Sequence, residues 1–396
     1  MNRPAGRLLL LIGSEALSRG FAFLLTAVVA RGMGLEVLAN LALAQSVVSY
    51  ATVLSDGGLN NHAIRMLLHG TSVARVVSLT LKTQALMAII TVALIVVLGP
   101  IIAPSAQEFI WALVLVPIAT ALSTPYVLQA RHVTWPVAFS RILGAVVTTV
   151  IGLCLVWMAA LPWTLGLAYS AGAIGMALWV CRSSSVTFAD VRGPVKLSEA
   201  AALLRQSAPL ALYGLLLQVV TSLPLLMTQA LHESESFEAM GLASRLWFIV
   251  TAPAAMAGSI LIPVFADKHS AKGTFRRYLL IAVLSGSACA LVFALLAPWV
   301  VPLLFGADSA PYWPAVVFFI SGSAPFYVAT IFICRSIAEG TYWVPAVGFA
   351  LGGCVFIAMS FMLPSSAGVG AGLSWLASQI VLCAVVVFLI LLGKRK

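Results

Sequence analysis

The sequence predicts an all-α polytopic membrane protein with twelve transmembrane helices. Hydrophobic residues make up 62% of the 396 residues and charged residues only 9%, whereas soluble domains contain about 45–50% and about 25%. Long uncharged windows recur along the whole chain, and about 20 residues of apolar helix are enough to cross a bilayer. When these windows are laid out as spans, all but three of the 22 Lys and Arg residues fall on one side of the membrane. Lipid is therefore the solvent for most of this chain.

An N-terminal segment and nine uncharged windows supply the spans. The first span covers roughly residues 8–30, and seven windows supply one span each: 37–55, 83–107, 109–130, 206–231, 246–266, 278–307 and 309–334. Two longer windows, 142–181 and 340–393, are each long enough for two spans. They are divided near Pro162-Trp163 and at Pro364-Ser365-Ser366, because proline and serine favour turns. The total is twelve.

The basic residues set the predicted orientation. Both ends of the chain and the basic loops fall on one side of the membrane. The turn after the seventh span falls on the other side and carries Glu233, Glu235 and Glu238. Since cytoplasmic loops retain Lys and Arg, both termini are predicted to be cytoplasmic, and the protein to lie in a bacterial inner membrane. The net charge of +10 then reflects loops that face anionic lipid headgroups. It does not indicate a nucleic-acid partner.

The longest cytoplasmic connection, residues 182–207, divides the chain into two predicted domains. An N-terminal six-helix bundle covers 1–181, and a C-terminal six-helix bundle covers 208–396. Because six is an even number, both halves enter the membrane from the same side, and any structural repeat is parallel. Trp135-Pro136 and Trp343-Val344-Pro345 introduce corresponding spans, which agrees with such a repeat.

Two arginines, Arg19 and Arg245, lie inside predicted spans, since the eighth span opens at 237, before its uncharged window starts at 246. An arginine at the centre of a membrane helix costs about 2.5–3.5 kcal/mol on insertion scales. Glu15 precedes Arg19 by four residues, so the two share a helix face. Either the pair neutralises itself so that the helix can insert, or both face a hydrated cavity where Arg19 meets an anionic substrate and Glu15 can be protonated. Arg245 has no acidic residue within a turn, so it either reaches outwards to the interface or binds an anion.

Further polar residues are candidates for lesser roles. Arg31, the one basic residue on the outer side, joins Arg19 and Arg245 as a candidate contact in an anionic-substrate cavity. Asp56 ends the second span beside two glycines, where it forms either a simple helix-end turn or an ion-coupling site. Glutamines in or near spans, such as Gln84 and Gln218, more often join helices than bind substrate.

The sequence gives no sign of catalytic chemistry. The GVGAG run at 368–372 opens a span and follows no strand, which excludes a dinucleotide fingerprint. The six cysteines lie in apolar runs without a CxxC pair, and the five histidines show no HExxH spacing. No outer loop is long enough for an active-site domain. We therefore expect a protein that is not an enzyme and has no cofactor or metal.

Several stretches resemble the lipid-linked oligosaccharide flippases of the multidrug/oligosaccharidyl-lipid/polysaccharide exporter superfamily. These stretches are ARGMG at 30–34, SDGGLNNHAIR at 55–65, FEAMGLASRL at 237–246, LIPVFAD at 261–267 and SAGVGAGLSWLASQ at 366–379. They follow the family's order over nearly the whole chain. Two departures occur: Asn40 stands where the family often has glycine, and the seventh span lacks the family's acidic residue.

The resemblance implies a carrier that moves undecaprenyl-pyrophosphate-linked repeat units, such as those of O-antigen, to the periplasmic leaflet. It implies two six-helix bundles around a central cationic cavity, in which the diphosphate meets Arg19 and Arg245, and rocking of the bundles exposes the cavity to either side. A coupling cation, proton or sodium, would drive transport, with Glu15 and Asp56 as candidate groups. The expected partners are the lipid-linked oligosaccharide, membrane lipid, and the polysaccharide polymerase and chain-length machinery.

Two alternatives stay open. A cation-coupled drug or metabolite antiporter of the same superfamily would need acidic residues to dominate its cavity, and here Glu15 is opposed by Arg19. A polytopic polysaccharide polymerase or ligase would need a sizeable outer loop with catalytic side chains.

Overall fold

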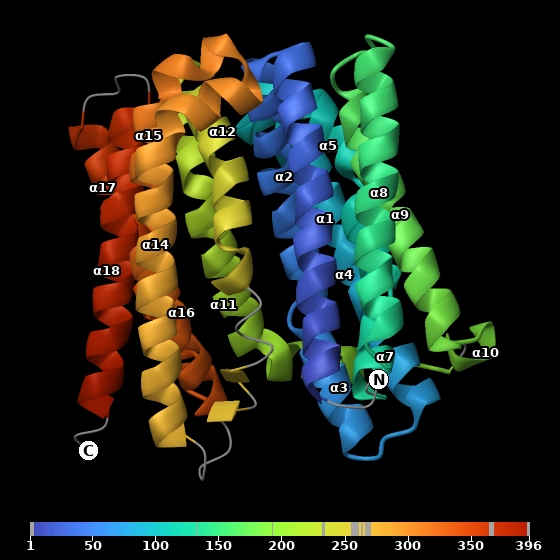
Figure 1. The fold of residues 1–396 in the computed structure, drawn as a ribbon. Helices are drawn as coiled ribbons and strands as arrows, with labels where there is room; N and C mark the ends of the chain where they lie inside the picture. Colours follow the sequence, from blue (N-terminus) through green and yellow to red (C-terminus); the bar gives the residue numbers. More distant parts are fainter. Residues whose placement is uncertain are drawn as a thin grey trace. The chain divides into compact units, whose positions relative to one another are not determined.

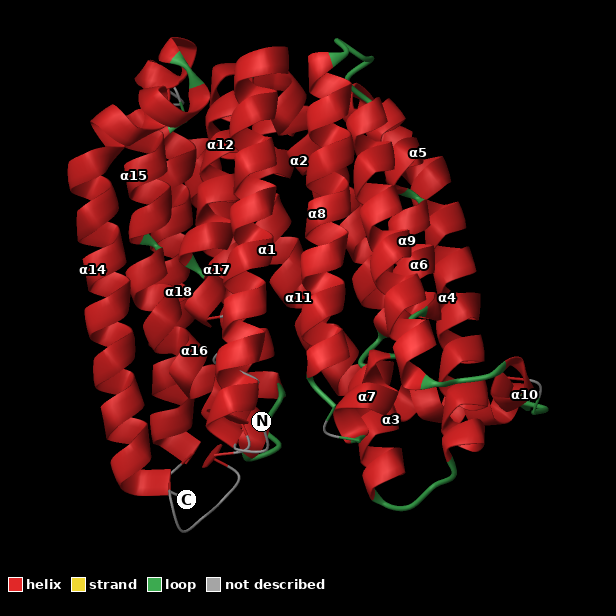
Figure 2. Ribbon diagram, turned by 45° about the vertical axis from the view of Figure 1, so that its right-hand side comes forward, coloured by secondary structure: helices red, strands yellow, loops and turns green. Residues whose placement is uncertain are grey.

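The computed structural model describes residues 4–131, 133–191, 193–231, 234–254, 261–262, 264–265, 271–363 and 368–393. These residues form helices joined by short turns, and they contain no strand (Figures 1 and 2). Eleven helical segments among them are long and apolar enough to cross a membrane. The predicted eighth span, 246–266, lies partly outside the described residues. The chain is thus an all-helical, multi-pass membrane protein.

The contacts between residues divide the chain into two compact units. Unit 1 comprises Met1–Leu25 and Leu43–Gln218, and unit 2 comprises Thr26–Ala42 and Val219–Lys396. Three helices contribute residues to both units: α1 (Pro4–Met33), α2 (Leu35–Asp56) and α11 (Leu197–Ala230). The predicted division into bundles at 1–181 and 208–396 remains a prediction.

Most of unit 1 consists of long membrane helices, with one interrupted span. Its other helices are α3 (Leu59–Leu68), α4 (Val73–Ile102), α5 (Gln107–Leu113), α6 (Leu115–Leu122), α7 (Pro125–Ala130), α8 (Trp135–Trp157), α9 (Thr164–Ser184) and the short α10 (Phe188–Val191). The fourth span begins with a 3-10 turn, η1 (Pro104–Ala106), and is interrupted between α5 and α6. Pro117 explains the interruption, because it has no N–H to donate to the Leu113 carbonyl.

Unit 2 has a matching series of helices. They are α12 (Ser234–Val250), α14 (Ala271–Phe305), α15 (Trp313–Ser321), α16 (Ser323–Ala338), α17 (Trp343–Met362) and α18 (Val369–Gly393). As in unit 1, a 3-10 turn, η2 (Ala307–Tyr312), opens a span that is interrupted, here between α15 and α16. The helices α8 and α17 begin at Trp135 and Trp343 and occupy corresponding positions, since α8 packs along α9 and α17 packs along α18. These paired features agree with a parallel repeat.

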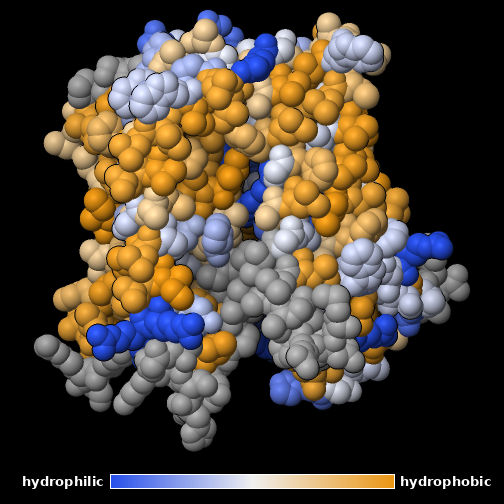
Figure 3. All heavy atoms as spheres, in the orientation of Figure 1, coloured by the Kyte–Doolittle hydropathy of each residue, from blue (hydrophilic) through white to orange (hydrophobic). Residues whose placement is uncertain are grey.

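The exterior of both units is hydrophobic. Large apolar side chains are exposed along α4, including Ile89, Val97 and Ile101, and along α14, including Leu284 and Leu291. Hydrophobic side chains cover much of the visible face of each unit, and hydrophilic ones gather towards the ends (Figure 3). Contiguous exposed apolar surface on this scale is rare in soluble monomers. It is the surface that lipid covers.

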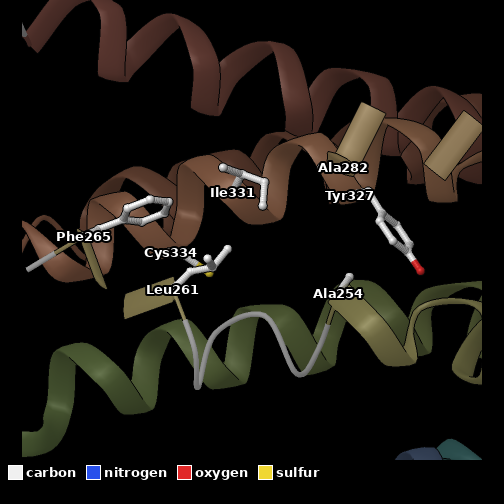
Figure 4. Close-up of a cluster of buried hydrophobic side chains, with 7 residues drawn as sticks. All are labelled: Ala254, Leu261, Phe265, Ala282, Tyr327, Ile331 and Cys334. Atoms are coloured by element: carbon white, nitrogen blue, oxygen red, sulfur yellow. The ribbon is translucent and has the colours of Figure 1, made fainter. Parts of the chain in front are cut away.

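Inside unit 2, one cluster of buried side chains joins α14, α16 and the residues after α12 (Figure 4). Its members are Ala254, Leu261, Phe265, Ala282, Tyr327, Ile331 and Cys334. Tyr327 brings a polar group into this cluster, and its hydroxyl donates to the Val250 carbonyl over 2.7 Å. The hydrogen bond removes most of the cost of burying that hydroxyl.

The segment that links α9 to α11 is bound to α4. Arg75 donates to the Pro194 carbonyl over 2.9 Å and pairs with Glu199 over 2.5 Å. Lys82 donates to the Gly193 carbonyl over 2.7 Å. Because α4 begins at Val73, both basic residues lie on a helix that crosses the membrane. They hold the linking segment at one end of unit 1.

Removing both side chains should loosen this segment. We expect an Arg75→Ala/Lys82→Ala double variant to be cut faster by trypsin after Arg192 or Lys196, because cleavage requires local opening of the chain. The rate is measured in inverted membrane vesicles by immunoblotting. Arg182→Ala, at an exposed position in the last turn of α9, is the control and should be cut at the wild-type rate. Equal rates for both variants would contradict the prediction.

Candidate functional site

Three charged side chains meet between α1 and α8. The Arg19 Nε atom donates to Glu15 Oε1 over 2.7 Å, and Arg141 Nη1 donates to Glu15 Oε2 over 2.9 Å. We call these three residues the arginine–glutamate cluster. Two guanidinium groups share one carboxylate, so the cluster carries one net positive charge inside predicted membrane spans.

Small residues bring α8 against α1 along this interface. A Cβ atom at Gly152 would lie 2.6 Å from the end of the Leu25 side chain, so any larger residue there would have to displace Leu25. The Thr149 hydroxyl donates to the Phe21 carbonyl over 3.1 Å, and the Ser18 hydroxyl contacts the Arg141 carbonyl at 3.4 Å. The cluster is therefore positioned by close helix packing.

The cluster is suited to hold an anion. Its side chains are largely shielded, with exposed fractions of 22% for Arg19, 19% for Glu15 and 35% for Arg141. The Arg19 Nη1 atom is buried and reaches no acceptor among the described residues. A buried donor of this kind costs about 1–3 kcal/mol, and more when it is charged. An anionic group that accepts from Nη1 would relieve this cost and balance the net charge.

The structure changes the sequence-based view of Arg19. We expected either a self-neutralising pair of Glu15 and Arg19 or a pair that faces a hydrated cavity, whereas Glu15 is shared with a second arginine. The excess charge belongs to the cluster and not to Arg19 alone. Arg141 was missed, since reading spans as uncharged windows placed it in a loop, but it lies in the second turn of α8. A helix start at Trp135-Pro136 could have revealed this.

Both carboxylate oxygens of Glu15 accept hydrogen bonds from arginine. An ion-coupling step at Glu15 would have to break or weaken these bonds. This role remains a prediction.

A second polar site lies around Asp56, at the end of α2. Asp56 Oδ1 accepts from Gln84 Nε2 over 3.1 Å and from the Asn60 backbone amide over 3.4 Å. Gln84 Nε2 also lies 3.3 Å from Asn60 Oδ1. Gln84 was predicted to join helices, and it does link α4 to the turn between α2 and α3. These three side chains line a cavity of about 460 Å³ within unit 1, together with residues of α6 and α11.

Two glycines make the turn at Asp56. Gly57 and Gly58 have φ values of 49° and 74°, a left-handed conformation that side chains with a Cβ atom disfavour. A Cβ atom at Gly58 would also lie 3.1 Å from the Leu210 Cβ atom. The glycine pair thus lets α3 start directly after α2, and it brings Asn60 back to Asp56.

The other predicted contacts lie in unit 2. Arg31 is exposed, and it donates to the Leu303 and Leu304 carbonyls at the end of α14. A cation at a helix C-terminus stabilises the helix, so Arg31 has a structural role. Arg245 is half-buried in α12 and has an interaction partner in the structure. Substrate contacts by Arg31 and Arg245 remain predictions.

Within the described part of the chain, no group of three or more His, Cys, Asp or Glu side chains could hold a metal ion. A cation at Asp56 would therefore take the other oxygen ligands from amide or hydroxyl groups.

Comparison with known proteins identifies the family and the fold. A family model described as polysaccharide biosynthesis protein matches residues 7–269, whereas no curated protein matches the chain. An inward-facing multidrug resistance transporter of the MATE family, of the MOP superfamily, has a TM-score of 0.78 and 13% identity, with 100% of both chains covered. The lipid II flippase MurJ, inward closed, has a TM-score of 0.76 and 12% identity, over 94% of this chain and 85% of that one.

A MATE transporter from Vibrio cholerae has a TM-score of 0.67 and 14% identity, over 99% of this chain and 97% of that one. At these identities the likeness establishes the fold. The family model covers well over half of the sequence. The chain therefore belongs to the polysaccharide biosynthesis protein family and has the fold of MOP-superfamily transporters.

Proposed function

We propose that this protein is a flippase for lipid-linked oligosaccharides. It would move undecaprenyl-pyrophosphate-linked repeat units from the cytoplasmic to the periplasmic leaflet of a bacterial inner membrane. It would work by alternating access with ion coupling, as a transporter and not an enzyme. Family membership supports a role in polysaccharide synthesis, and the shared fold with a lipid II flippase supports lipid transport.

The observation that carries this proposal is the net positive arginine–glutamate cluster. A pyrophosphate is the most strongly charged part of the substrate, and Arg binds phosphate through charge-assisted hydrogen bonds. In the membrane such bonds are less screened than in water. We assign Arg19 and Arg141 to the pyrophosphate, with Glu15 holding both guanidinium groups in position. Arg245 is a further candidate contact in unit 2.

The multidrug transporters with this fold favour a second candidate, a cation-coupled drug or metabolite antiporter. That function suits an acidic site, because the coupling cation needs negatively charged ligands. Here the carboxylate of Glu15 is outnumbered by two guanidinium groups. The charge of the cluster therefore favours an anionic passenger.

The test measures which leaflet holds the glycan. Spheroplasts that lack the protein are treated with a membrane-impermeant oxidant of sugar diols, and the lipid-linked oligosaccharides are then extracted and analysed by mass spectrometry. We expect the oxidised fraction to fall sharply without the protein and to recover when the gene is supplied. In the same cells the resistance to cationic drugs should not change. An unchanged oxidised fraction with lost drug resistance would overturn the proposal in favour of the antiporter.

A further inference from the structure

The cavity at Asp56 contains a buried acceptor that no described residue satisfies. Gln84 is 1% exposed, and its Oε1 atom has no hydrogen-bond partner in the described part of the chain. The orientation of the amide is fixed by Asp56, because turning it over would place Oε1 against the carboxylate. An unsatisfied buried acceptor costs about 1–3 kcal/mol. Gln84 lines the cavity, so a donor that enters from the cavity side would satisfy this acceptor.

The hydroxyl groups around the cavity also present acceptors. Ser123 donates its proton to the Thr120 carbonyl over 2.7 Å, and Ser55 donates to the Thr52 carbonyl over 3.0 Å. Thr120 donates to the Val116 and Pro117 carbonyls. A hydroxyl has one proton and two lone pairs, so these groups can only accept from a ligand. With the Asp56 carboxylate and Gln84 Oε1, these hydroxyl groups give the polar part of a largely apolar lining several acceptors.

The size of the cavity separates two classes of donor-rich ligand. At about 460 Å³ it could hold on the order of 15 water molecules of about 30 Å³ each. A cation bound by protein oxygens needs a tight shell, with ligands at about 2.3–2.6 Å for calcium. The cavity is far roomier, and its volume falls in the range of small-molecule sites. A sugar, with several hydroxyl donors, fits both the volume and the lining.

We propose that this cavity binds sugars of the lipid-linked oligosaccharide, with Asp56 and Gln84 accepting hydrogen bonds from their hydroxyl groups. The inference rests on the proposed flippase function and adds a glycan site to it. All lining residues belong to unit 1, as does the arginine–glutamate cluster. The two sites divide recognition by chemistry: the cluster binds the pyrophosphate, and the Asp56 cavity binds the sugar.

The test measures binding of the glycan and binding of the pyrophosphate separately. Three probes are added to the purified full-length protein: lipid-linked oligosaccharide extracted from the host, the free oligosaccharide released from it by mild acid, and undecaprenyl pyrophosphate without sugar. Affinities are measured by calorimetry. We expect Gln84→Leu to weaken binding of the free oligosaccharide roughly 5- to 150-fold, which corresponds to about 1–3 kcal/mol. Binding of undecaprenyl pyrophosphate should not change.

Two further variants control for misfolding. Gln45→Leu makes the same change on α2 outside the cavity lining and should bind all probes like the wild type. Asn61→Ala changes an exposed residue of the lining, so it should fold normally and still weaken glycan binding. Arg19→Ala should show the opposite pattern to Gln84→Leu, with weakened pyrophosphate binding and unchanged glycan binding.

The outcomes distinguish this inference from the proposed function. If the wild type binds the intact substrate but not the free oligosaccharide, or if Gln84→Leu and Asn61→Ala bind it normally, the glycan site is wrong and the flippase function stands. If sodium alone stabilises the wild type against heat and not Gln84→Leu, while glycan binding is equal, the cavity is a cation site. If no lipid-linked probe binds, the proposed function itself fails.

Discussion

Arg19→Glu should abolish surface polysaccharide in cells that depend on this protein, at an unchanged protein level. The substitution turns the net charge of the arginine–glutamate cluster from positive to negative, because two carboxylates then face Arg141 alone. Arg19→Ala should have a smaller effect. It removes hydrogen bonds between charged groups worth about 1.5–3 kcal/mol, which corresponds to roughly 10- to 150-fold in affinity. Surface polysaccharide is measured by gel electrophoresis and protein level by immunoblotting.

Glu15→Gln is the matched variant for this prediction. It keeps both arginines and raises the charge of the cluster, so pyrophosphate binding should be retained. A loss of transport with retained binding would assign Glu15 to ion coupling. Normal surface polysaccharide in Arg19→Glu would refute the assignment of the cluster to the substrate. Arg245→Glu tests the candidate contact in unit 2 in the same way.

Gly172→Val should strongly destabilise unit 1. Gly172 lies where α9 crosses α8, and a Cβ atom there would overlap the Thr148 hydroxyl and lie 2.6 Å from the Gly144 carbonyl oxygen. The obstacle at Gly144 is backbone, so the helices themselves must move apart. Overpacking of this kind typically costs about 1–3 kcal/mol. We expect the thermal midpoint of the detergent-solubilised protein, followed by size-exclusion chromatography, to fall by several degrees.

Gly175→Val is the control on the same helix. Its Cβ atom would have its nearest neighbour, the Val147 side chain, at 4.0 Å. Both variants change helix propensity equally, so only the steric term differs between them. Equal losses of stability in the two variants would show that packing at Gly172 is not the cause.

The membrane helices could be predicted from the sequence because each crossing of the bilayer needs a long apolar helix. The predicted break near Pro162-Trp163 lies between two observed helices, since α8 ends at Trp157 and α9 starts at Thr164. The predicted break at Pro364-Ser365-Ser366 lies outside the described residues, between the end of α17 at Met362 and the start of α18 at Val369. Helix ends were less predictable. Most spans were taken as uncharged windows, whereas α4 carries Arg75 and Lys82 in its first turns, where they bind the linking segment.

The candidate site was predictable only where it is local in sequence. Glu15 and Arg19 are one turn apart, so their pairing follows from helix geometry. Arg141 is 126 residues from Glu15, and only the packing of α1 on α8 brings them together. Gln84 and Asp56 are likewise 28 residues apart. Gln218 was predicted to join helices, and it does so by donating to the Ser46 carbonyl over 3.2 Å.

The three helices that belong to both units restrict how this polypeptide can be divided. A gene split within the link between α9 and α11 would encode one fragment without residues 197–218 and another without residues 26–42. Each fragment would lack helix residues that belong to its own compact unit. Co-translation of the two pieces in one cell, and not separate purification, is therefore the way to obtain an assembled protein from them.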